Sequence, residues 1–269
     1  SLIGQKYLYG SLTLVSGMNI TANSTYVLVF ESRSSINLTT GGLSIPIGLY
    51  QNMFGGTLTL QDSFTSTEDL SLAYGTFNAN GFNVLCTNLQ NNYSTVNATI
   101  NMGSGTWTLT GTGDVWSLNS TGTTINAGTS TLIINDTSTG SKTFSGRGKT
   151  YNNITFSGDN ITVSGNNTFN TMAVNTAGLA NGVKFTSGST QTVSSFTTNG
   201  SAGNLAIIQS TTAGSAHTLA KADSVDVSVN YMSIQDSTAT PADTWYAGAN
   251  STNVSGNSGW IFTSPTTTS

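Results

Sequence analysis

Short runs of alternating apolar and polar residues, separated by clusters of Gly, Asn, Ser and Thr, fill most of the chain and limit what it can fold into. They follow one another about every 8 to 12 residues, and typical runs read SLTLVSG, GTLTLQD, TWTLTG and STLIIND. β-Branched and aromatic side chains pack well on a pleated sheet, whereas Gly and Asn favour turns. Because no long stretch shows a helical period, the sequence predicts an all-β fold with almost no helix.

Strands at this spacing are typical of a sandwich, a barrel or a solenoid, and two features favour the solenoid. The runs resemble one another, since NNITFSG at 152–158 is followed by DNITVSG at 159–165. The loops between the runs are also uniform in length and rich in Asn and Gly. Charged residues make up only 7% of the chain, so strand edges lack their usual charged protection, which calls for a coiled or closed architecture. We therefore expect a parallel β-helix of about ten coils, each of about 20 residues.

Both ends depart from this rhythm, as the capping units of a solenoid do. We predict an N-terminal cap or attachment region over 1–56, the β-helix over 57–236, and a C-terminal cap and tail over 237–269. The unusually apolar segment GLSIPIGLYQNMFGG is interpreted as a docking surface. Its candidate residues are Ile45, Ile47, Leu49, Met53 and Phe54. The candidate C-terminal cap residues are Trp245, Tyr246, Trp260 and Phe262.

Charge and hydropathy exclude two kinds of partner. The net charge is −4 and the seven Lys and Arg residues are scattered, whereas binding to a phosphate backbone needs a clustered basic face. The longest apolar run, YVLVF at 26–30, is far shorter than the roughly 20 residues that span a bilayer. We expect neither nucleic acid nor a membrane as a partner.

The ionisable residues give little support for catalysis. Glycoside hydrolysis needs two carboxylates facing one bond, and the candidate pairs are Glu68 with Asp69, Asp223 with Asp226, and Asp236 with Asp243. Adjacent residues of a strand point to opposite faces, and the other pairs meet only through a turn that the sequence does not define. We interpret these residues as solvated loop carboxylates.

The single histidine and the single cysteine are also expected to be structural. His217 has no Gly-x-Ser-x-Gly turn nearby, which favours a surface or cross-strand histidine over a catalytic base. Cys86 has no second cysteine for a disulfide or a thiolate metal site, so we expect a small buried hydrophobe. No calcium-binding Gly-Gly-x-Gly-x-Asp repeat occurs. We predict no enzyme activity, no cofactor and no metal.

Aromatic residues near the C-terminus leave two interpretations open. Tyr231, Trp245, Tyr246 and Trp260 are candidates for a sugar-binding platform, but an end cap accounts for them equally well. We favour the cap.

Several segments resemble a β-helical repeat module of bacteriophage structural proteins and large bacterial surface proteins. They are GSGTWTLTGTGDVW, SKTFSGRGKTYNNITFSG, NNTFNTMAVN, VKFTSGSTQTVSSF, NLAIIQSTTAG, NYMSIQDS and WYAGANSTNVSGNSGWIF. They appear in the family's order and cover roughly residues 70 to 262. The resemblance implies a right-handed parallel β-helix with a structural or adhesive role.

These observations lead us to expect a non-enzymatic virion protein, either a phage capsid decoration (cement) protein or a fibre component. The expected partners are further copies of the chain in a homotrimer, a major capsid or other virion protein, and a surface glycan. A secreted bacterial surface adhesin or extracellular filament subunit is the alternative. A polysaccharide-degrading β-helix is less favoured.

Overall fold

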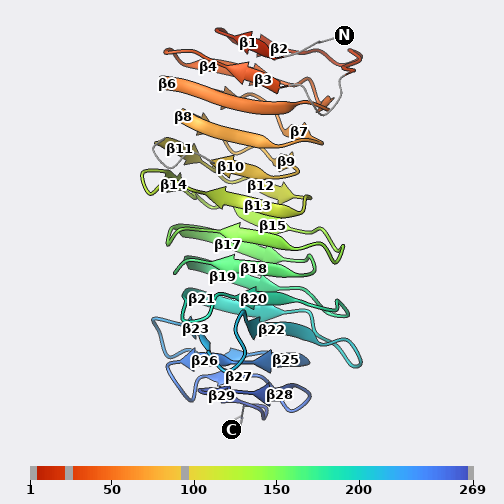
Figure 1. Ribbon diagram of the computed structural model, residues 1–269, viewed down its shortest axis with the longest axis vertical. Helices are drawn as coiled ribbons and strands as arrows, with labels where there is room; N and C mark the ends of the chain where they lie inside the picture. Colours follow the sequence, from red (N-terminus) through yellow and green to blue (C-terminus); the bar gives the residue numbers. More distant parts are fainter. Residues whose placement is uncertain (1–4, 22–26, 92–96, 266–269) are drawn as a thin grey trace. The chain divides into compact units, whose positions relative to one another are not determined.

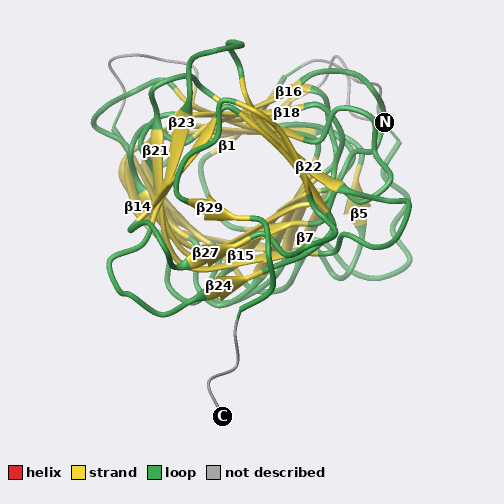
Figure 2. Ribbon diagram, turned by 90° about the horizontal axis from the view of Figure 1, so that it is seen from below, coloured by secondary structure: helices red, strands yellow, loops and turns green. Residues whose placement is uncertain are grey.

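The computed structural model describes residues 5–21, 27–91 and 97–265. Figure 2 shows strands and loops but no helix among them. The predicted all-β parallel β-helix is confirmed, because parallel strands stack as the coils of a β-solenoid and the chain makes about 11 turns. None of the described residues forms a helix that is long and apolar enough to cross a membrane.

Residue contacts divide the chain into two units, Ser1–Ile133 and Ile134–Ser269. In the N-terminal unit one row of paired strands contains β1 (Lys6–Leu8), β3 (Val27–Phe30), β6 (Gly48–Leu60), β8 (Leu70–Asn78), β10 (Leu89–Asn91) and β13 (Gly113–Leu118). A second row contains β5 (Ser44–Ile45), β7 (Phe64–Ser66), β9 (Val84–Cys86), β12 (Thr106–Leu109) and β15 (Thr131–Ile134), which ends at the unit boundary. The third contains β2 (Leu12–Thr13), β4 (Ile36–Thr39), β11 (Ala98–Asn101) and β14 (Thr124–Asn126), completed by the second halves of β6 and β8.

Strict alternation builds the interior of the N-terminal unit. Leu70 pairs with Leu89 in the next coil, and both side chains are buried. Trp107 of β12 contacts Phe77 at a ring distance of 5.8 Å and Trp116 at 6.3 Å. Because side chains of a strand point alternately inward and outward, each coil covers the apolar residues of the next.

The C-terminal unit repeats this arrangement, and its strands are drawn in the green to blue colours of Figure 1. One row contains β16 (Lys142–Ser145), β18 (Ile161–Ser164), β20 (Val183–Phe185), β22 (Ala206–Ser210), β25 (Met232–Gln235) and β28 (Thr252–Ser255). The second contains β17 (Thr150–Phe156), β19 (Thr168–Val174), β21 (Thr190–Thr198), β23 (His217–Ala220) and β26 (Ser237–Thr240). The third contains β24 (Val227–Ser228), β27 (Trp245–Tyr246) and β29 (Trp260–Ile261).

Parallel pairing continues through the segments that the sequence suggested were atypical ends. Strand β6 runs uninterrupted across the predicted boundary after residue 56. Beyond residue 236, β26 pairs with β23, and Trp245 of β27 pairs with Trp260 of β29. The end segments differ in composition, but they use the same strand pairing as the rest of their units.

Candidate binding pocket

The predicted docking surface is wrong for four of its five residues. Ile45, Ile47, Leu49 and Met53 are each at most 2% exposed. The first three alternate along the chain, so they all face inward, and Ile45 and Ile47 lie at the base of a partly open apolar pocket. The apolar character of this segment therefore belongs to the core. Phe54 is the exception, with 52% of its surface exposed.

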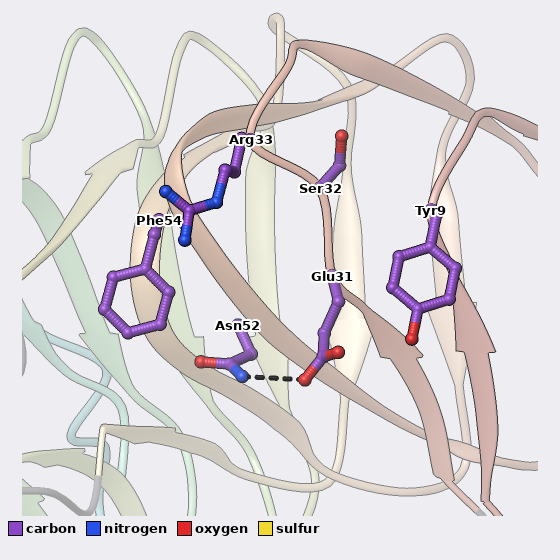
Figure 3. A pocket seen from close by; sticks show the side chains of 6 residues that line it. All are labelled: Tyr9, Glu31, Ser32, Arg33, Asn52 and Phe54. Carbon is purple, nitrogen blue, oxygen red and sulfur yellow. Dashed lines mark hydrogen bonds between the residues drawn. The ribbon is translucent and has the colours of Figure 1, made fainter.

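Phe54 lines an open pocket of about 510 Å³ in the N-terminal unit. Its lining residues are Tyr9, Glu31, Ser32, Arg33, Asn52 and Phe54. Figure 3 shows the rings of Phe54 and Tyr9 on opposite sides, with Glu31 and Asn52 between them. The pocket thus has two aromatic walls and a polar floor.

Three successive coils bring these residues together. The Glu31 backbone N–H donates to the Leu8 carbonyl at 2.9 Å, which holds Tyr9, the residue after Leu8, beside Glu31. The Asn52 amide Nδ2 donates to Glu31 Oε1 at 2.9 Å, which ties the next coil to the floor. The site depends on coil register, because Glu31 and Asn52 are far apart in sequence.

A glycine-lined corner presents Phe54 to solvent. The pairing of β6 with β8 shifts register between Asn52 and Thr57, so the intervening residues bend away from the regular ladder. The opposing Gly75 has φ +81°, and a Cβ atom there would lie 2.1 Å from the Met53 carbonyl oxygen. Phe54 stacks on Tyr74 with ring centroids 3.9 Å apart. The corner therefore fixes an exposed aromatic ring on the rigid frame of the coils.

Carboxylates elsewhere hold turns of neighbouring coils. Asp62 accepts hydrogen bonds from the backbone N–H groups of Thr40 and Gly41, both at 2.7 Å. Asp236 accepts one from the Gly214 N–H at 3.0 Å and is 2% exposed. The interpretation of Asp236 as a solvated loop carboxylate is therefore wrong, because its buried oxygen has a structural partner.

Asp69 is likewise occupied by side chains of the next coil. Burial raises the pKa of its carboxyl, which hydrogen bonds from Asn88 only partly offset. Asn88 Nδ2 lies 2.9 Å from Oδ1 and Gln90 Nε2 lies 3.0 Å from Oδ2. Both oxygens of Asp69 thus join coils.

His217 is completely buried and faces the interior, so it is not a surface histidine. Its Nε2 lies 3.1 Å from Ser237 Oγ, which also accepts a hydrogen bond from the Trp260 indole at 3.0 Å. Burial lowers the pKa of His217 to about 4. The serine and histidine are adjacent, but they are enclosed in the interior and cannot meet a substrate there.

Two of the four aromatic residues predicted as a cap, Trp245 and Trp260, lie in the interior of the last coils. Trp245 is fully buried and Trp260 is 9% exposed. Their rings are 5.3 Å apart, and Phe196 packs against both. Tyr246 and Phe262 are half-buried. The alternative of a sugar platform is wrong for both tryptophans, because their faces are covered.

Cys86 is buried, as predicted, and burial raises the pKa of its thiol. Within the described parts of the chain no three His, Cys, Asp or Glu side chains come together in a way that could hold a metal ion. Comparisons with protein-family models, curated proteins and solved structures give no match for this chain.

Proposed function

We propose that this chain is a non-enzymatic structural protein of a bacteriophage particle, and that its N-terminal unit binds a surface glycan. The observation that carries the binding proposal is the pocket in which Phe54 and Tyr9 flank the Glu31 and Asn52 pair. The assignment to a particle is supported by the resemblance to phage structural proteins and by the β-solenoid fold.

The chemistry of the pocket suits a sugar. A pyranose ring has one face rich in C–H bonds, which packs against the electron-rich face of an aromatic ring. Its hydroxyl groups both donate and accept hydrogen bonds, so they match the Glu31 carboxylate, the Asn52 amide and the Arg33 guanidinium. Because the pocket is open, it suits one residue of a longer glycan.

The position of the pocket suits a protein that acts by attachment. Phe54 stacks on Tyr74 on the frame of the coils, so this wall needs little ordering when a ligand binds. A rigid solenoid that presents a preformed pocket serves adhesion without chemical change to the ligand.

The binding proposal is tested by applying the purified full chain to an array of capsular polysaccharides, O-antigens and linear oligosaccharides. We expect specific binding by the wild-type chain. Replacing Phe54 by Ala should weaken it at least tenfold, or about 1.4 kcal/mol. Phe54→Tyr keeps the ring and should retain binding. A wild-type chain that binds no glycan, or a Phe54→Ala variant that binds as well as wild type, would contradict the proposal.

A bacterial surface adhesin is the second candidate, because a glycan pocket on a β-solenoid is equally useful there. Immunogold labelling separates the two by location. Labelling of phage particles supports the particle protein, and labelling confined to bacterial surface filaments supports the adhesin. The predicted homotrimer and the virion protein partner stay predictions.

A further inference from the structure

A regular array of threonine and asparagine covers the outer face beside the pocket. It is formed by the second halves of β6 and β8 together with β11 and β14, where the sequence reads TLT, TFN, TIN and TIN. The middle residues Leu58, Phe77 and Ile100 are fully buried, and Ile125 of β14 is half-buried. The flanking threonines and asparagines therefore point outward, because alternate residues of a strand face opposite sides.

Strand pairing aligns these side chains into two ladders. The first contains Thr57, Thr76, Thr99 and Thr124. The second contains Thr59, Asn78, Asn101 and Asn126. Neighbouring rungs are about 4.8 Å apart, and the two ladders are about 6.6 Å apart. Each rung of the array thus presents one threonine hydroxyl group beside a second polar side chain, and the four rungs extend over about 14 Å along the stack of strands.

The array begins where the pocket ends. Gly55 and Gly56 alone separate Phe54 from Thr57. Gly75 alone separates Tyr74, which stacks on Phe54, from Thr76. The stacked rings therefore stand at the corner between the pocket and the first two rungs.

We propose that the ligand of the pocket is a neutral, linear glycan that continues from Phe54 along these two ladders. This inference rests on the proposed function. A sugar polymer repeats its hydroxyl groups from ring to ring, and the array repeats its hydroxyl and amide groups from rung to rung. A chain that lies along the stack therefore meets similar partners at each step.

The polar groups of the array have capacity for such a ligand. Asn126 Nδ2 donates to Asn101 Oδ1 at 2.7 Å. An asparagine amide has two N–H hydrogens and a carbonyl with two lone pairs, so this bond uses only part of its capacity. All eight array residues are half-buried or exposed, and none is ionisable. This neutrality favours a glycan without repeated charges.

The inference is tested by calorimetry with the linear oligosaccharide that binds best in the glycan-array experiment. It is supplied as a length series from disaccharide to octasaccharide. We expect affinity for the full chain to rise several-fold with each added sugar and to level off when the ligand is longer than the four rungs. Affinity should change little between low and high salt. An affinity that does not depend on length, or that falls steeply with salt, would overturn the inference.

A matched pair of variants tests the array itself. Thr76→Val with Thr99→Val removes two hydroxyl groups from neighbouring rungs but keeps the β-branched shape. The control, Thr143→Val with Thr162→Val, alters an equivalent outward pair of β16 and β18. We expect the array variant to bind the long oligosaccharide about tenfold more weakly and the disaccharide unchanged, whereas the control binds both as wild type does.

The outcomes separate this inference from the proposed function. Equal loss in the array variant and the control, or no loss in either, would overturn the array as a glycan track while Phe54-dependent binding stands. Loss of phage-particle association with unchanged glycan affinity would also overturn it, because the array would then be a protein-docking face. Failure of the wild-type chain to bind any glycan would remove both proposals.

Discussion

The two units share one coil design but differ in where they place unusual side chains. The buried side chains of the N-terminal unit's described residues include no charged group, whereas the C-terminal unit buries the charged residues Lys142, Asp159, Lys221 and Asp236 and the neutral His217. The exposed large apolar residues show the reverse bias. Tyr7, Tyr9, Val15, Met18 and Phe54 belong to the N-terminal unit, and Val225 and Val254 to the C-terminal unit.

This difference indicates that the coils accept two kinds of unusual side chain, a buried charge and an exposed aromatic ring, and that the two have different consequences. A buried charge is retained only with partners, so it makes stability depend on pH and on single contacts. An exposed aromatic residue contributes little to stability but offers a contact surface. We infer that substitutions should affect stability most in the C-terminal unit and binding most in the N-terminal unit.

The largest effect is expected at Lys142, whose ammonium is buried. It lies 2.8 Å from Asp136 Oδ1 and donates to the Gly140 carbonyl at 2.8 Å. Lys142→Met leaves these acceptors without their cation and should lower the free energy of unfolding by about 3 kcal/mol in urea denaturation. The control is Lys184→Met, because Lys184 is half-exposed and donates to Asn160. It should cost less than about 1 kcal/mol, and an equal loss in both variants would contradict the comparison.

A similar effect is expected from pH through His217. Burial lowers its folded-state pKa from 6.5 to about 4, so between these values the unfolded chain binds a proton that the folded chain does not. The contribution of neutral His217 to the free energy of unfolding is fully present above the unfolded-state pKa. The free energy of unfolding should fall by about 3 kcal/mol as the pH drops from about 6.5 to about 4. Thermal unfolding across this range measures the loss.

His217→Gln should flatten the pH dependence in that window. The lowered carboxyl pKa values act at lower pH, and the raised pKa of Asp69 acts in the opposite direction, because the folded chain keeps that proton more readily than the unfolded chain. Burial would raise the pKa of Asp136, but hydrogen bonds from Lys142 and Ser138 outweigh it and keep the pKa below 3.8. A variant with the same slope as wild type between pH 6.5 and 4 would show that His217 is not the group responsible.

A smaller loss of stability is expected at the corner of the pocket. Gly75→Ala places a side chain at φ +81° and against the Met53 carbonyl, and it should cost about 2 kcal/mol. Gly113→Ala is the control, because φ is +76° there but no atom lies within 4 Å of the added Cβ. It should cost about 1 kcal/mol. Only Gly75→Ala should weaken glycan binding, and equal affinities would show that the corner does not position Phe54.

The smallest effect on stability is expected at Phe54. Its ring is half-exposed and stacks on Tyr74, so Phe54→Ala should change the free energy of unfolding by less than about 0.5 kcal/mol. Equilibrium denaturation in urea measures this value on the same samples used for the glycan array. A large loss of stability would mean that lost binding reflects unfolding rather than a missing contact.

The fold was predictable because its signal is local and repeated. Alternation in runs such as NNITFSG defines an inward and an outward face, and stacking is the way for short runs of this kind to bury their apolar side chains together. The same rule explains the error at Ile45, Ile47 and Leu49, since their alternation already places all three on one buried face.

The pocket was less predictable because it depends on register between coils. Phe54 was identified, but as part of an apolar surface, and nothing local in the sequence relates it to Tyr9 or Glu31. That relation comes from pairing, as in the contact of Asn52 with Glu31. Of the two expectations for His217, the cross-strand position is confirmed by its contact with Ser237, and the surface position is wrong. Its burial was not predictable because its strand reads like its neighbours, whose polar residues mostly face outward.

The central claim is that the N-terminal unit binds a glycan. Hydrogen exchange of the full chain, with and without the oligosaccharide that binds best in the glycan-array experiment, tests this claim most directly. The account predicts slower exchange in peptides covering 6–12, 27–34, 48–60 and 70–78, and, for a ligand long enough to reach the third and fourth rungs, in 98–101 and 124–126. Exchange should be unchanged throughout the C-terminal unit. Protection that falls mainly on the C-terminal unit, or saturating ligand that protects no peptide of the N-terminal unit, would contradict it.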